Sequence, residues 1–153
     1  FGYITADSDP LKADQGRDYL LPASQAALPM LSQRSDNGFF LMIEGSQIDW
    51  GGHANLADYI ITEFIDFDKT VAAVLDWAKK DGETLVVVTA DHETGGFAIQ
   101  VESTMDNLVT AFTSTKHTGT MIPVFAYGPG SEKFAGIYEN TEIHTKMRAA
   151  FGW

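Results

Sequence analysis

The stretch FFLMI at residues 39–43 decides the fold class that the sequence predicts. Five apolar residues in a row, directly after the turn-forming Asp36-Asn37-Gly38, are typical of a strand buried on both faces. Glu44-Gly45 ends the run. A strand of this kind belongs to a sheet that helices cover on both sides.

A long amphipathic helix is predicted to follow, beginning near Asn55 as its N-cap with Asp58 three residues later. Apolar residues recur at three- and four-residue steps along one face: Leu56, Ile60, Phe64, Phe67, Val71, Val74 and Ala78. Lys79 and Lys80 in the last turn, with Gly82 after them, are typical of a helix C-terminus.

The remaining apolar runs extend this pattern. Residues 84–89 predict a second buried strand, and residues 121–127 a third apolar run that the turn Gly128-Pro129-Gly130 closes. Residues 141–151 predict a final amphipathic helix. Strands that alternate with helices in this order predict an α/β fold, with a mostly parallel sheet flanked by helices.

The 153 residues are enough for one domain with a substantial core. Residues 1–37 predict a poorly defined loop and helix, with a short helix over 22–32 interrupted near Pro29, and residues 38–153 form the core that carries the chemistry. Because the chain opens at Phe1 without an initiator Met, we expect a processed or truncated product.

Composition limits the possible functions. A formal net charge of -11 argues against nucleic-acid binding, which needs a basic patch. No apolar run approaches the ~20 residues of a membrane-spanning helix. Since the chain has no Cys, a metal ion would be held by His, Asp and Glu alone.

Side chains of those types follow the predicted strands. The first strand runs into Glu44, then Asp49 and His53, and the second runs into Asp91-His92. Ligands of open α/β sheets bind beyond the carboxyl ends of the strands, so these side chains are expected at one site.

The spacing of each pair also allows a plainer interpretation. Asp49 and His53 are four residues apart, which aligns them on one helical face, although Gly51 and Gly52 favour a loop that enters the helix. A solvated Asp and a surface His would have the same spacing. Asp91-His92 at a strand end equally fits a terminating Asp beside a packed His, while Gly95-Gly96 beyond them permits unusual backbone dihedrals.

The other two histidines differ in context. His117 lies in a loop between two apolar stretches, and it is a candidate ligand only because the chain holds other candidate ligands. His144 on the final helix is interpreted as structural. His and Asp suit zinc with an open coordination position, and the oxygen-only Glu44 suits magnesium. Two neighbouring divalent ions would clamp a phosphoryl group and offset the acidic charge of the chain.

Four motifs carry a resemblance to a known family. MIEGSQIDWGGH at 42–53 resembles the metal-binding segment of alkaline phosphatases, and TADHETGG at 89–96 and HTG at 117–119 resemble two further motifs of that family in the same order. YGPG at 127–130 resembles the strand and turn near the family's end. The resemblance covers 38–153. The first three motifs occur in the order of the family and carry ligand types, which makes the resemblance specific.

The resemblance implies two zinc ions and one magnesium ion. It implies a first zinc bound by Asp49, His53 and His117, a second bound in part by Asp91 and His92, and a magnesium bound in part by Glu44. In the family, a serine attacks phosphorus to give a phosphoseryl enzyme that is then hydrolysed. Residues 1–37 contain no counterpart of this serine, and Arg17 and Arg34 lack the context of a phosphate-binding arginine. The chain is therefore predicted to be the C-terminal portion of such an enzyme, with little or no activity alone.

Further expectations come from the resemblance alone: phosphate monoesters as substrates, a periplasmic or secreted location, and a possible homodimer. Trp50 is expected to shape the mouth of the site, or else simply to pack. Two alternatives stay open. One is a related sulfatase, phosphodiesterase or phosphoglycerate mutase, and the other is a non-catalytic metal-binding domain.

Overall fold

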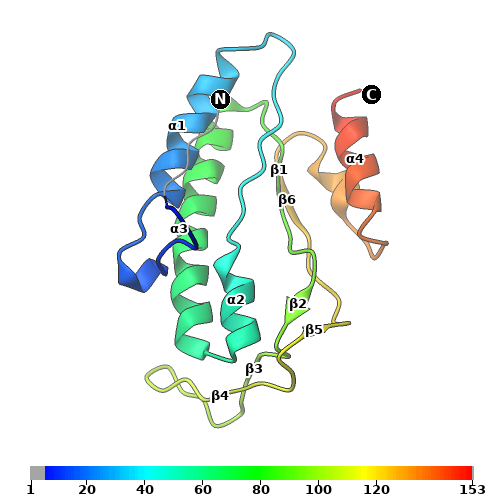
Figure 1. The fold of residues 1–153 in the computed structure, drawn as a ribbon. Coiled ribbons are helices and arrows are strands. Elements are labelled where there is room, and N and C mark those ends of the chain that lie inside the picture. The colour runs from blue at the N-terminus through cyan, green and yellow to red at the C-terminus, as the bar shows by residue number, and fades with distance from the viewer. Residues whose placement is uncertain (1–5, 153) are drawn as a thin grey trace.

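The computed structural model describes residues 6–152. Its longest element is helix α3, Ala57–Asp81, against which α1 (Leu20–Ser32), α2 (Gln47–Ala54) and the short 3-10 helix η1 (Ala13–Gln15) pack. Figure 1 shows these helices on one side of the strand segments and α4, Glu142–Ala150, on the other. The predicted N-terminal loop that falls in residues 1–5, Phe1 included, lies outside the described residues.

The ends of α3 agree only in part with the sequence. Gly82 ends the helix with φ 76°, and its N–H donates to the carbonyl of Ala78, as predicted. The start differs, because Leu56 is the N-cap and Asn55 closes α2 instead, with φ 53°. Asparagine tolerates this left-handed conformation better than most residues, so it caps the C-terminus of one helix rather than the N-terminus of the next.

Helix α1 is continuous, so the predicted interruption near Pro29 is wrong. The proline falls in the final turns of the helix, which ends at Ser32, and one missing N–H there removes little of the hydrogen-bond ladder. The final helix is confirmed: α4 half-buries Ile143, Met147 and Phe151 along one side.

The strands form three separate two-stranded ladders. β1 (Val86–Val88) pairs with β6 (Phe125–Tyr127), β2 (Glu93–Thr94) with β5 (His117–Thr118), and β3 (Ala98–Ile99) with β4 (Thr110–Ala111). Each described pair is antiparallel, with Val86 opposite Tyr127 in the first. The α/β class is confirmed, whereas the described pairs differ from the predicted mostly parallel sheet.

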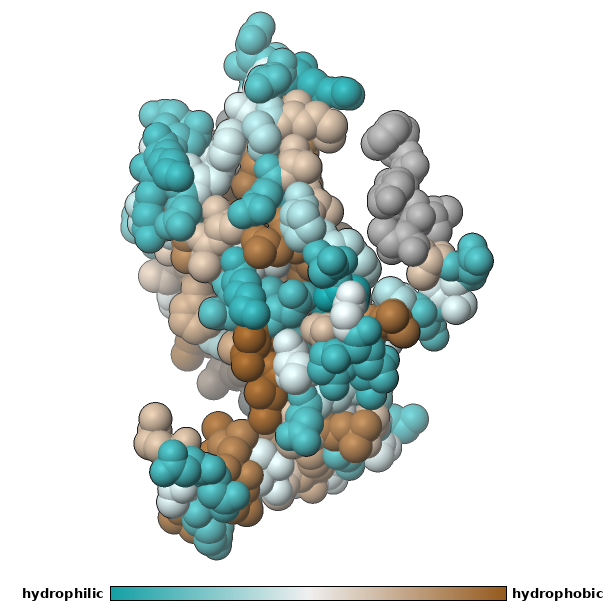
Figure 2. Space-filling model, turned by 90° about the vertical axis from the view of Figure 1, so that its left-hand side faces the viewer, coloured by the Kyte–Doolittle hydropathy of each residue, from teal (hydrophilic) through white to brown (hydrophobic). Residues whose placement is uncertain are grey.

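Residues 39–43 explain part of that difference. The segment forms neither a helix nor a strand, and it has no partner strand within residues 6–152. Phe40 and Met42 are 58% and 74% exposed, while Leu41 and Ile43 on the other face are half-buried. The predicted strand buried on both faces is therefore wrong for this chain, because nothing in the described residues covers its outer face. Figure 2 shows hydrophobic residues, drawn in brown, exposed in several places on the face that it draws.

Polar groups hold the N-terminal segment against the α2–α3 hairpin. Gln47 is 1% exposed, its amide nitrogen lies 3.1 Å from the carbonyl oxygen of Pro10, and its amide oxygen accepts from the Tyr59 hydroxyl at 2.6 Å. The Arg17 guanidinium contacts Glu63 at 2.6 Å and Asp66 at 2.7 Å. The Gln47 contacts tie α2, which carries two of the predicted ligands, to the N-terminal segment and to α3. The Arg17 contacts tie the same segment to α3.

No helix in the described part of the chain is long and apolar enough to cross a membrane.

Candidate metal centre

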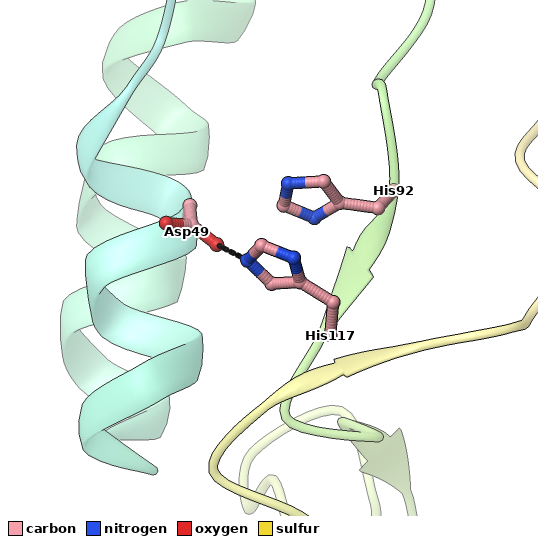
Figure 3. Close-up of side chains that lie close together, drawn as sticks. All are labelled: Asp49, His92 and His117. Carbon is pink, nitrogen blue, oxygen red and sulfur yellow. Dashed lines mark ion pairs between the residues drawn. The ribbon is translucent and has the colours of Figure 1, made fainter.

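Three side chains that are distant in sequence meet at one point. One ligand atom each from Asp49, His92 and His117 lies within 4.8 Å of the other two. Figure 3 shows Asp49 on α2 facing the two imidazole rings across the gap to the strands. His53 joins them, with its Nε2 atom 3.1 Å from Nε2 of His117 and 3.4 Å from Oδ1 of Asp49.

Helix α2 presents Asp49 and His53 one turn apart on the same face. The loop predicted around Gly51 and Gly52 is wrong, because both glycines lie inside the helix and are buried. A Cβ on Gly51 would lie 2.9 Å from the backbone nitrogen of Ile60. These glycines permit close packing against neighbouring backbone, rather than supplying a flexible entry to the helix.

The other two ligands are His117 in β5 and His92, which directly precedes β2. Thr94 lies opposite His117, and Glu93 lies opposite Thr118. Side chains of opposed residues share a face of an antiparallel ladder, and residues two apart along a strand share a face as well. His92, Thr94 and His117 therefore point towards α2. The two rings stack with their centroids 3.5 Å apart.

The opposite face of the ladder holds a separate network around Glu93. Its carboxylate accepts hydrogen bonds from the backbone N–H groups of Gly96 at 3.0 Å and Phe97 at 3.1 Å, and from the Thr118 hydroxyl. Burial alone would raise the pKa of Glu93, but these hydrogen bonds outweigh it and lower the pKa below its ordinary value. The ionised Glu93 thus ties the turn after β2 to β5.

The backbone fixes the orientation of His53. Its Nδ1 atom lies 2.8 Å from the carbonyl oxygen of Thr115. A carbonyl oxygen can only accept, so Nδ1 carries the hydrogen and the lone pair of the neutral ring resides on Nε2. That lone pair faces Asp49 and His117. A histidine that ligates a metal typically makes such a supporting hydrogen bond through its other nitrogen.

The remaining predicted residues lie at different distances from this cluster. Asp91 is 85% exposed, with Oδ2 3.2 Å from Nε2 of His92. Glu44 is exposed and lies outside the cluster of Asp49, His92 and His117. Trp50 is 36% exposed on α2 and makes no ring or hydrogen-bond contact with the cluster among the described residues. His144 is exposed on α4.

Arg17 has a structural context that the sequence did not reveal. Its side chain is 7% exposed and both of its acidic partners lie on α3. Burial alone would lower the pKa of Arg17, but hydrogen bonds to Asp66 and Glu63 outweigh it and raise the pKa above its ordinary value. The guanidinium is thus already engaged by carboxylates.

Two contacts in the cluster were missed from the sequence. The Thr94 hydroxyl lies 2.5 Å from Asp49 Oδ1, and the Thr115 carbonyl contacts His53. A signal for Thr94 was present, because it follows His92 by two residues at a strand end and so shares its face. A carbonyl contact leaves no trace in residue identity.

The donor set fits a divalent metal. Imidazole nitrogens and a carboxylate oxygen are the ligands that zinc takes in proteins without thiolates, and a catalytic zinc keeps an open coordination position. Asp49 and His53 offer these atoms from α2, His117 offers them from β5, and His92 offers them from the position directly before β2.

Comparison with known proteins identifies the family of this chain. The family model described as alkaline phosphatase matches residues 12–111 and 100–153. The chain belongs to the alkaline phosphatase family. Solved structures support the same fold: alkaline phosphatase from the Antarctic bacterium TAB5 is 48% identical, with a TM-score of 0.86 over 94% of this chain and 44% of that chain. A TAB5 variant with Mg bound has a TM-score of 0.89 over 98% of this chain and 46% of its own.

Curated relatives extend the likeness. Alkaline phosphatase 3 of Bacillus subtilis is 33% identical over 88% of this chain and 45% of its own length. Streptomycin-6-phosphate phosphatase of Streptomyces griseus is 32% identical over 90% of this chain and 36% of its own length. The chain thus spans less than half the length of these relatives.

Proposed function

We propose that this chain supplies most zinc ligands and one magnesium ligand to an enzyme that hydrolyses phosphate monoesters through a phosphoserine intermediate. The observation that carries the proposal is the convergence of Asp49, His92 and His117 within 4.8 Å, in a chain of the alkaline phosphatase family. The relatives named above are all phosphatases, which favours this proposal over a sulfatase or phosphodiesterase.

Each ligand has a proposed place. Asp49, His53 and His117 bind the first zinc, Asp91 and His92 contribute to the second, and Glu44 contributes to a magnesium. When bound, these ions supply positive charge that holds phosphate oxygens and stabilises the leaving oxygen. Contacts within the chain support the first set most directly, since His53 touches both Asp49 and His117. Glu44 is supported only by its position in the 42–53 motif.

The attacking serine is proposed to come from the part of the enzyme that corresponds to the remaining length of the relatives. Among residues 6–152, Thr94 offers the only hydroxyl that hydrogen-bonds to Asp49, His53, His92 or His117, and this hydroxyl is already engaged by Asp49. We therefore expect the isolated chain to bind metal and phosphate but not to turn over phosphate esters. A periplasmic or secreted location and a homodimer remain proposals from family membership.

Phosphorus NMR of inorganic phosphate tests the proposal. The metal-stripped chain is loaded with Co(II), a paramagnetic substitute for zinc, and the width of the phosphate line is measured. We expect broadening in the parent and in a His144→Ala control, and its loss in His117→Ala. Circular dichroism establishes that each variant is folded. A folded parent that leaves the phosphate line at the width given by free Co(II) would contradict the proposal.

Hydrolysis of p-nitrophenyl phosphate, measured beside phosphate binding, distinguishes this proposal from the alternative of a non-catalytic metal-binding domain. No turnover by a chain that binds phosphate supports a ligand-bearing portion of a phosphatase. Metal binding without phosphate binding would instead favour a non-catalytic metal-binding domain.

A further inference from the structure

Thr94 connects the helix-borne and strand-borne parts of the metal centre. Its hydroxyl oxygen lies 2.5 Å from Oδ1 of Asp49 and 3.1 Å from Nδ1 of His92. Asp49 comes from α2, and His92 precedes β2. Within residues 6–152, no other hydroxyl hydrogen-bonds to two of the proposed ligands.

The directions of these two hydrogen bonds follow from the number of protons. A threonine hydroxyl has one proton to donate and lone pairs to accept with. The carboxylate of Asp49 can only accept, so the hydroxyl proton goes to Asp49. The contact with His92 must then run the other way, with Nδ1–H donating to the Thr94 oxygen. The hydrogen of His92 is thereby placed on Nδ1, and the Nε2 lone pair is left for a metal.

Asp91 is the competing group, because its Oδ2 atom lies 3.2 Å from the same Nε2 and would favour a proton there. Its side chain is 85% exposed, whereas Thr94 is half-buried between α2 and the ladder. The Thr94 contact is the better shielded of the two, and hydrogen bonds shielded from water are electrostatically stronger.

Packing holds the hydroxyl in place. A Cβ atom on Gly52 would lie 2.9 Å from the Cγ2 atom of Thr94, so the methyl group sits directly against the glycine. With the methyl against α2 and the backbone in the β2–β5 ladder, the rotation of the Thr94 side chain is restricted. The hydroxyl is thus presented to Asp49 and His92 without a large entropic cost.

We propose that Thr94 is a positioning residue for metal binding: it orients the Asp49 carboxylate and selects the His92 tautomer whose Nε2 is free to bind a metal. The proposal rests on the proposed function in taking Asp49 and His92 as ligands. It assigns Thr94 no contact with metal or substrate. A single hydroxyl then links a ligand of the first zinc to a ligand of the second.

Thr94→Val and Thr94→Ser test the proposal as a matched pair. Valine keeps the shape but removes the hydroxyl, and serine keeps the hydroxyl but removes the methyl group. We expect Thr94→Val to weaken zinc binding about 10–100-fold, which is the usual effect of removing a partner that orients a metal ligand. Thr94→Ser should stay within a few-fold of the parent. Zinc affinity is measured by calorimetric titration of the metal-stripped chain.

Nitrogen NMR of the His92 ring in the metal-free chain gives an independent readout. Nδ1 should carry the proton in the neutral ring of the parent and of Thr94→Ser, and Thr94→Val should shift the proton towards Nε2. A purely structural role for Thr94 would leave this tautomer unchanged.

The two readouts keep the proposals apart. If the parent binds no zinc, the proposed function fails, and the tautomer still decides whether Thr94 orients His92. If the parent binds zinc and Thr94→Val binds it equally well with an unchanged tautomer, the role of Thr94 is wrong and the proposed function stands. Equal losses in Thr94→Ser and Thr94→Val would assign the effect to methyl packing and also overturn the proposal.

Discussion

The α carbon of Gly52 in helix α2 faces Thr94 in strand β2 so closely that an added Cβ atom would lie 2.8 Å from the carbonyl oxygen of Thr94. Gly95 meets Gly52 in the same way, since its Cβ would lie 2.8 Å from the carbonyl oxygen of Gly52. This contact between helix and strand sets the spacing between Asp49 on one side and His92 on the other.

Gly52→Ala should therefore destabilise the chain. Alanine in a helix interior is normally favoured over glycine by about 1 kcal/mol. Here the new methyl group meets backbone that cannot swing away, and overpacking of this kind costs about 1–3 kcal/mol. Urea denaturation measures the free energy of unfolding. Gly119→Ala is the control, because nothing lies within 4 Å of the added atom. A Gly52→Ala variant more stable than the parent would contradict the close contact.

Arg17→Ala should be among the most destabilising changes outside the metal centre. It leaves Glu63, 2% exposed, and Asp66 without their cation. Removing one partner of a buried ion pair typically costs about 3–5 kcal/mol. Lys79→Ala is the control, because its 3.8 Å pair with Asp76 is exposed and such pairs contribute about 0–1 kcal/mol. Equal losses of unfolding free energy in the two variants would show that the Arg17 cluster is not buried in solution.

The ionisation of Tyr59 predicts that the free energy of unfolding falls at alkaline pH. Burial, and then the negative charge of Glu63, raise the pKa of the Tyr59 hydroxyl above its ordinary value. The folded chain therefore holds this proton more tightly than the unfolded chain. The resulting stability is complete below the unfolded pKa of about 10 and is lost as the pH rises through the folded pKa.

Tyr59→Phe isolates that contribution. At neutral pH the variant should lose about 0.5–1.5 kcal/mol, since the hydrogen bond to Gln47 disappears. Urea denaturation at increasing pH should then show a shallower alkaline fall in the variant than in the parent. Parallel curves would mean that the Tyr59 hydroxyl titrates alike in the folded and unfolded chains.

The unpaired segment 39–43 predicts self-association. It presents Phe40 and Met42 to solvent beside backbone groups that no strand within residues 6–152 pairs with, and such edges associate with other strands. Sedimentation should show concentration-dependent association of the parent and much less with Phe40→Lys combined with Met42→Lys. Ile137→Lys, at a residue 87% exposed elsewhere, is the control. A parent that stays monomeric at high concentration would refute this expectation.

Several features that local sequence determines were predicted well, although the predicted interruption at Pro29 and the loop at Gly51 and Gly52 were wrong. Gly82 ends α3 and the apolar face of α4 is half-buried, because caps and helical periodicity depend on neighbouring residues alone. Asp49 and His53 share a helical face because their spacing requires it once a helix forms. The membership of His117 in the cluster depended on the resemblance to a family, since a lone histidine that the sequence predicts in a loop has no local signal; the structure places it in β5.

Features set by distant partners were predicted poorly. The exposure of Phe40 depends on which strand covers residues 39–43, and the segment itself cannot specify that. The antiparallel pairing of β1 with β6 is likewise decided by a partner almost forty residues away in the chain. Asn55 suits a helix N-cap and also tolerates the left-handed conformation of a C-cap, and the structure has the second.

Calorimetric titration of zinc into the metal-stripped chain decides whether Asp49, His53 and His117 form a metal centre, with the parent compared against His53→Ala and a His144→Ala control. We expect saturable binding by the parent and by His144→Ala. His53→Ala should lose more than the about 10–100-fold expected for removing a supporting hydrogen bond, because it removes a ligand. Saturable binding that His53→Ala leaves unchanged, or no binding by a chain shown to be folded, would contradict a metal centre built on Asp49, His53 and His117.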